Sequence, residues 1–244
     1  MAATRICAVN SNIREVNVKS GRPFSGYAAM AGGAMAILLA PVMVIIKYMT
    51  GWAVVPEPLW VGTAEDALGA LLQFATPPGL WMAYGTAYTI ALSLMLVGFI
   101  GLSGPMRDAQ GRLHTKGYWI VLVGLCIVIP GDAIHTWTWH QNGLRTPTPG
   151  TNPLANTAYA AHMMGMNFIM VGSLAVGVSA LRRKFLAPWL AWSFLLILPS
   201  AVVASTTLLP TTPSGALWWF SVIMLTCGYF LATGNPRRLV AARQ

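Results

Sequence analysis

The sequence predicts an all-α integral membrane protein, a bundle of about six transmembrane helices with both termini in the cytoplasm (N-in/C-in). Of its 244 residues, 56% are hydrophobic and only 9% are charged, whereas a soluble domain carries about a quarter charged residues. Six segments are each long and apolar enough to cross a bilayer, which takes about 20 residues as a helix. Basic residues are concentrated at one end of these segments, and such a bias sets the orientation in the membrane.

The six segments lie in a transmembrane domain at residues 25–235, between a flexible basic tail at 1–24 and a basic C-terminus at 236–244. The tail has no short apolar core followed by a small-residue cleavage site, so we do not expect it to be a signal peptide. Backbone polar groups in lipid must be satisfied within each segment, and the alternation typical of barrel strands is absent, so helices are expected. The predicted spans are 27–49, 81–103, 117–137, 157–181, 185–209 and 215–233.

Lysine and arginine residues predict the orientation of the bundle. All 15 except Lys47 and Arg145 fall on one side of a six-span arrangement. Because basic residues favour the cytoplasmic side, both termini are predicted to be cytoplasmic in a cell membrane. The net charge of +9 then reflects residues that attract anionic lipid headgroups, and a nucleic acid partner is not expected.

The longest connection, between the first two spans, carries a separate helix signal. Thr63, followed by Glu65 and Asp66, is typical of a helix start with a capping hydroxyl and acidic residues in the first turn. We predict a short interfacial helix that runs to about Ala75. No connection is long enough for a soluble domain, so the function is expected within the bundle or at its outer face.

Ionisable residues inside the spans are the candidates for chemistry, because a charge at a bilayer centre costs roughly 2.5–3.5 kcal/mol. The third span ends with Asp132 and His135, and the fourth begins with His162 at a similar depth in the outer leaflet. Asp132 and His135 are three residues apart and therefore share a helix face. Pro130 removes an amide donor just before Asp132, so a kink or break is expected there.

Two further patterns predict the geometry of the spans. Pro41 and Pro199 lie inside the first and fifth spans and are expected to kink them. Pairs of small residues four apart allow helices in membranes to approach closely. Such pairs occur in the fourth span as Ala161/Gly165 and Ser173/Gly177, and the first span holds a similar cluster at 32–34.

A haem or metal centre is the first interpretation of the polar residues. Asp132, His135 and His162 can ligate one metal ion, with His140 as a further ligand if the helix frays. Met166 lies one turn from His162, and a thioether with imidazole suits copper or an axial position on haem. Haem b or copper is thus the expected cofactor, held by His135, His162 and Met166. The protein would then be an oxidoreductase, and other membrane subunits are its expected protein partners.

Three other interpretations stay open. Asp132 and His135 form a proton or cation relay in a small transporter, or they act as catalytic acid and base on a lipid-like substrate, with Glu65 as another acid. In the third, the polar pair only holds helices together in an accessory subunit without chemistry of its own. The sequence contains no Walker loop and no G-x-S-x-G, H-E-x-x-H or C-x-x-C motif, each of which marks a known kind of site.

Overall fold

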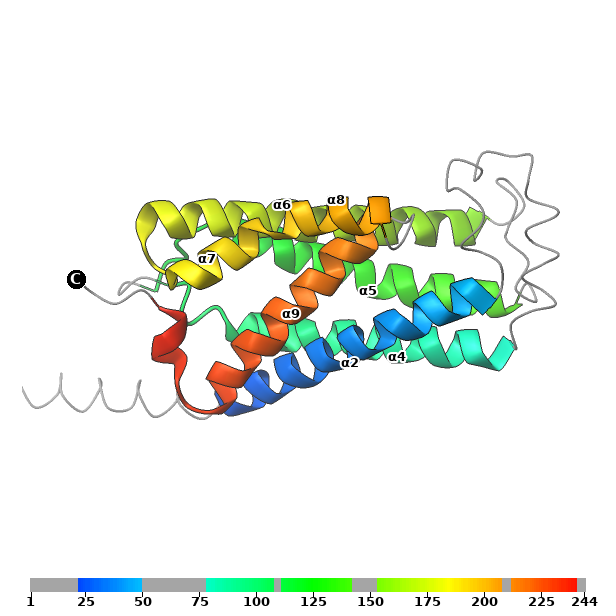
Figure 1. The fold of residues 1–244 in the computed structure, drawn as a ribbon, viewed down its shortest axis with the longest axis horizontal. Coiled ribbons are helices and arrows are strands. Elements are labelled where there is room, and N and C mark those ends of the chain that lie inside the picture. Colours follow the sequence, from blue (N-terminus) through cyan, green and yellow to red (C-terminus); the bar gives the residue numbers. More distant parts are fainter. Residues whose placement is uncertain (1–21, 50–77, 108–110, 142–152, 208–211, 241–244) are drawn as a thin grey trace, which may run out of the picture.

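The computed structural model describes a bundle of helices (Figure 1). Among the described residues, the one β interaction is an isolated bridge between Arg107 and Leu113. The predicted interfacial helix from Thr63 to Ala75 lies outside the residues that the structure describes. The described ranges are 22–49, 78–107, 111–141, 153–207 and 212–240. The helices are α2 (Arg22–Met49), α4 (Pro78–Gly101), α5 (Gly117–Gln141), α6 (Pro153–Arg183), α7 (Pro188–Leu195), α8 (Ile197–Thr207), α9 (Thr212–Ala232) and the 3₁₀ helix η3 (Pro236–Leu239).

Four helices within the described part of the chain, α2, α4, α5 and α6, are long and apolar enough to cross a membrane. They coincide with the first four predicted spans, so the prediction of an all-α, multi-pass membrane protein is confirmed. The apolar stretches of α7–α8 and α9 are shorter. Large apolar side chains such as Trp119, Val171 and Trp192 are exposed on the outside of the bundle, as expected for a surface covered by lipid tails.

The predicted span at 185–209 is made of two helices, because the chain breaks between α7 and α8 at Leu196. Pro199 explains the break, as expected from the sequence: it has no N–H to donate to the Leu195 carbonyl, and its ring crowds that group. The neighbouring carbonyl of Ser193 accepts a hydrogen bond from the Trp219 indole N–H of α9, at 2.8 Å. At this break the chain leaves α6, on which α7 packs, and reaches α9, on which α8 packs.

The expected break at Pro130 is wrong, since α5 is a single helix from Gly117 to Gln141, whereas a kink within it stays a prediction. The helix α2 likewise continues through Pro41. Both prolines are exposed at the surface of the bundle, where the ring does not disturb helix packing. Both helices are thus continuous across their prolines, and Asp132 and His135 lie within α5.

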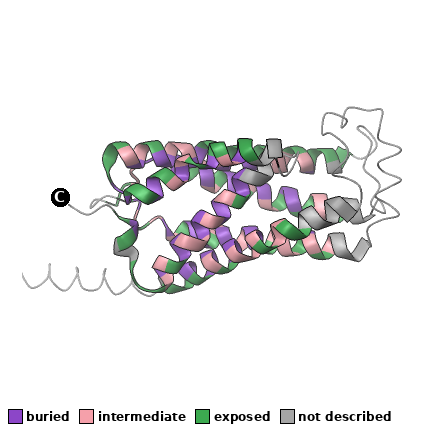
Figure 2. Cartoon of the chain, in the orientation of Figure 1, coloured by how far each residue is buried: buried purple, intermediate pink, exposed green. Residues whose placement is uncertain are grey.

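The helices α2, α4, α5 and α6 run in alternate directions along the bundle, α7 and α8 both run opposite to α6, and α9 runs back again (Figure 1). The helix α5 packs along α6, and α2 lies between α4 and α9, while α4 also contacts α5. Buried residues, coloured purple, lie mainly on the sides of the helices that face one another (Figure 2). Phe99 of α4, Phe194 of α7 and Phe220 of α9 are fully buried in this core.

Glycines allow α5 and α6 to touch along their backbones. They recur every seven residues, at Gly117, Gly124 and Gly131 of α5 and at Gly165 and Gly172 of α6. A β-carbon at position 124 would lie 2.7 Å from the Gly165 carbonyl oxygen, and one at position 165 would lie 2.7 Å from the Val128 amide nitrogen. Real β-carbons do not approach so closely, so these positions accept only glycine at this helix separation.

The predicted small-residue contacts are present with several different partners. Gly165 packs against α5, whereas Gly177 packs against Ala191 and Leu195 of α7. On α2, Gly32 packs against α4 and the adjacent Gly33 packs against α9. Helix packing in this bundle therefore depends on close backbone approach at most of its interfaces, as is usual where lipid provides no hydrophobic drive.

One end of the bundle is tied together by contacts between three segments. The Arg183 side chain donates a hydrogen bond to the His114 carbonyl at 2.7 Å, and the His114 ring stacks on Phe185. The Ala187 amide donates to the Leu239 carbonyl at 3.0 Å. These contacts join the α4–α5 connection, the α6–α7 turn and η3, and both ends of the described chain lie here (Figure 1).

Candidate functional site

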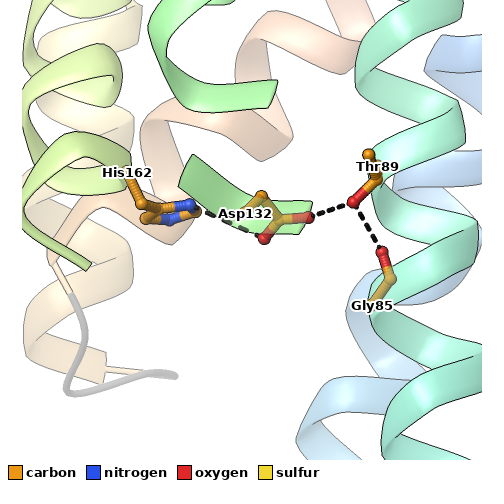
Figure 3. A network of polar contacts seen from close by, with 4 residues as sticks. All are labelled: Gly85, Thr89, Asp132 and His162. Atoms are coloured by element: carbon orange, nitrogen blue, oxygen red, sulfur yellow. Dashed lines mark hydrogen bonds and ion pairs between the residues drawn. The ribbon is translucent and has the colours of Figure 1, made fainter. Parts of the chain in front are cut away.

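Asp132 is the one acidic residue among those the structure describes, although the whole chain has six. Its side chain is buried on α5, between α4 and α6 (Figure 3). Asp132 Oδ2 lies 2.7 Å from Thr89 Oγ1 of α4. Asp132 Oδ1 lies 3.6 Å from His162 Nδ1 of α6. One carboxyl group therefore joins three helices, and burial makes these partners necessary, since an isolated buried charge is strongly unfavourable.

Close helix packing brings these side chains together. A β-carbon at Gly131 would lie 2.8 Å from the His162 amide nitrogen, so α5 touches α6 directly beside Asp132. On the other side, a side chain at Gly85 would collide with Thr136, so α4 and α5 also approach closely. The two glycines thus set the spacing that lets Asp132 reach across to both neighbouring helices.

Thr89 is a partner of Asp132 that sequence reasoning missed. Its hydroxyl also lies 2.9 Å from the Gly85 carbonyl one turn earlier. Such a bond is common for threonine in membrane helices, so nothing in the local sequence distinguishes Thr89. Two tyrosines on the same helix, Tyr84 and Tyr88, stack on each other and lie within electrostatic range of Asp132. The polar cluster is therefore larger than predicted and extends onto α4.

His135 lies one turn after Asp132 on α5 and is half-buried. Its ring packs against Tyr159 of α6, with the ring centroids 5.7 Å apart. The imidazoles of His135 and His162 are close enough to interact electrostatically. The expected proximity of Asp132, His135 and His162 is therefore found, and the contact that joins Asp132 to an imidazole is the one with His162, at 3.6 Å.

The predicted metal site is not assembled in the described part of the chain. No three histidine, cysteine, aspartate or glutamate side chains there are grouped so that they could hold a metal ion. The side chain of His140, one predicted ligand, lies outside this part. Met166, the predicted thioether ligand, is buried in the hydrophobic core. Among the described side chains, Asp132 and His162 thus form a pair and not a complete ligand set.

A haem between α5 and α6 does not fit either. A porphyrin ligated by His135 and His162 needs helices that are separated by the width of the ring. The backbones of α5 and α6 are instead in contact at Gly124 and Gly165, and again where Gly131 meets His162. The two backbones are therefore already in contact at His162 and within a turn of it, which leaves no room there for a porphyrin ring.

The chain matches no protein family model, no curated protein and no solved structure.

Proposed function

We propose that this protein is a small proton- or cation-coupled transporter in which Asp132 binds and releases the proton. The observation that carries the proposal is the buried Asp132 side chain with its partners Thr89 and His162 on two other helices. Ionisable groups inside membrane helices commonly mark proton relays and ion pathways. A change in the protonation of Asp132 would alter contacts between three helices at once, which is what coupling to movement requires.

A purely structural role for the polar cluster is less well supported. Replacement of a buried ionisable pair by apolar side chains of similar volume is often neutral or stabilising. The Asp132–His162 pair is therefore a poor means of holding helices together, especially where Gly124, Gly131 and Gly165 already allow backbone contact. Proton binding gives these side chains a role that apolar residues cannot fill.

In the proposed topology the chain crosses the membrane six times, with α7 and α8 together as the fifth crossing and α9 as the sixth. The alternating helix directions and the position of both described ends at one end of the bundle support this (Figure 1). Arg182 and Arg183 in the last turn of α6 and Lys116 just before α5 would then be cytoplasmic and face anionic headgroups. Asp132 would lie in the outer half of the membrane.

Cysteine labelling of intact cells tests the orientation, with Cys7→Ser as the background. In two separate variants, one cysteine is added in place of the exposed residue Asn156 or Arg182, which lie near opposite ends of α6. A membrane-impermeant maleimide is expected to label Asn156→Cys in intact cells and Arg182→Cys only after lysis. The Cys7→Ser protein without an added cysteine measures the labelling that comes from Cys126 and Cys227. The opposite labelling pattern would show that the N-in/C-in orientation is wrong.

Proton movement is measured with the purified full chain in liposomes that contain a pH-sensitive dye. A potassium gradient with valinomycin imposes an inside-negative potential, and proton entry is followed by the dye. We expect entry faster than in protein-free liposomes of the same lipid composition. An identical rate in both preparations, across acidic and neutral pH and with either direction of potential, would reject proton movement by this protein.

A further inference from the structure

The hydroxyl group of Thr89 lies within hydrogen-bond distance of two oxygen atoms but has only one proton. Thr89 Oγ1 is 2.7 Å from Asp132 Oδ2 and 2.9 Å from the Gly85 carbonyl oxygen (Figure 3). A hydroxyl group donates one hydrogen bond and otherwise accepts, so Thr89 donates to one of these oxygens at a time. The Gly85 carbonyl has no proton to give. When both contacts are hydrogen bonds, the second proton must therefore come from the Asp132 carboxyl group.

The contact with His162 agrees with an uncharged Asp132. His162 Nδ1 and Asp132 Oδ1 are 3.6 Å apart, and His162 Nδ1 forms no hydrogen bond in the described structure. A protonated imidazole and a carboxylate usually approach to about 2.7–2.9 Å. The 3.6 Å separation from His162 is thus longer than that of a hydrogen-bonded ion pair and agrees with a neutral acid beside a neutral imidazole.

The ionised form of Asp132 requires a different arrangement of the same atoms. A carboxylate only accepts hydrogen bonds, so Thr89 must turn its proton away from Gly85 and toward Asp132. The Gly85 carbonyl keeps its helical bond from the Thr89 amide, because α4 is helical through both residues. Neither arrangement leaves a buried carbonyl without a donor, so the helix tolerates both.

We propose that Thr89 is a proton-linked positioning residue, which donates to Gly85 when Asp132 is protonated and to Asp132 when Asp132 is ionised. The inference rests on the proposed proton-binding role of Asp132 and identifies the partner whose hydrogen bond changes with each proton. Among the described residues, the other titratable groups near Asp132 are Tyr84 and Tyr88 on α4, His162 on α6 and, on α5 itself, His135.

Infrared difference spectroscopy of the full chain in lipid nanodiscs tests this assignment. The carbonyl-stretching band of a protonated carboxylic acid is separate from carboxylate bands, and it falls in wavenumber when the group donates a hydrogen bond. In the wild type, we expect a band that disappears as the pH is raised and that Asp132→Asn removes at every pH. In Thr89→Val the band is expected at higher wavenumber, because the neutral acid has lost its acceptor. Thr89→Ser should restore the wild-type position.

Thr226→Val is the matched control. The Thr226 hydroxyl makes the same type of bond, to the Val222 carbonyl at 2.8 Å, but lies on α9. This variant should leave the Asp132 band unchanged. Thr89→Ala removes the same hydroxyl if Thr89→Val does not fold. An Asp132 band at the wild-type position in the variant that lacks the hydroxyl would overturn the inference, as would the absence of an Asp132-dependent band at every pH.

The infrared and flux measurements separate the two proposals. Proton flux that depends on Asp132, together with an unshifted band in the Thr89 variant, would reject the role of Thr89 alone. A shifted band in a protein that moves no protons would reject transport and leave the hydrogen-bond exchange at Thr89 in place.

Discussion

Replacement of Gly165 by valine is expected to prevent stable packing of α5 on α6 and to lower the free energy of unfolding by about 3 kcal/mol or more. A β-carbon at this position would lie 2.7 Å from the Val128 amide nitrogen and 2.8 Å from the Gly124 carbonyl oxygen. These are backbone atoms, so no change of side-chain rotamer relieves the overlap. The two helices would have to separate, which would also separate Asp132 from His162. Unfolding in mixed detergent micelles, followed by circular dichroism, measures the change.

Ala160→Val is the matched control for this prediction, because Ala160 is exposed on the same helix. It adds a branched side chain facing outward and should change stability by less than about 0.5 kcal/mol. Valine has a higher helix propensity than glycine, so the propensity term alone would stabilise Gly165→Val. Equal stability of Gly165→Val and Ala160→Val would show that α5 and α6 are not packed as closely as described.

Asp132→Asn is expected to reduce proton entry into liposomes to the rate of protein-free liposomes, at every pH tested. Asparagine is close to aspartate in size and can still hydrogen-bond to Thr89, but it cannot take up or release a proton. Because Asp132 is the one acidic residue in the described part of the chain, no other carboxyl group there can replace it. The rate of dye acidification under an imposed potential is the measurement.

Asn167→Ala provides the control for the loss of flux. Asn167 is an exposed polar residue on α6 whose side chain donates to the Met163 carbonyl, and it is not part of the Asp132 network. This variant should retain the wild-type rate. An Asp132→Asn protein that moves protons at the wild-type rate would contradict the proposed function, whatever its stability.

The extent of the helices could be predicted from the sequence because membrane thickness fixes the length of an apolar run. The fourth span was expected at 157–181, and α6 runs from Pro153 to Arg183. The break at Leu196 could not be located in the same way. Pro199 predicts a disturbance but not its form, which also involves the hydrogen bond from Trp219 of α9 to the Ser193 carbonyl. That bond joins residues 26 positions apart.

The candidate site was predicted in part. Asp132 and His162 are rare ionisable residues at matched depth on adjacent spans, and they do lie side by side. Thr89 could not be found, because its role depends on how α4 is positioned against α5. The seven-residue glycine repeat, from Gly117 to Gly131 on α5, was the available signal for the α5–α6 contact. It also argues against a haem between these helices, since backbones in contact leave no space for a porphyrin.

The glycine contacts also have a mechanical consequence for the polar cluster. Helices whose backbones are in contact resist sliding and separation, so we expect α5 and α6, which carry Asp132 and His162, to behave as one rigid pair. Thr89 belongs to α4, which packs against α5 less extensively than α6 does. The Asp132–His162 separation is therefore set by main-chain contact at Gly131, whereas the Asp132–Thr89 separation depends on the less extensive packing of α4 on α5.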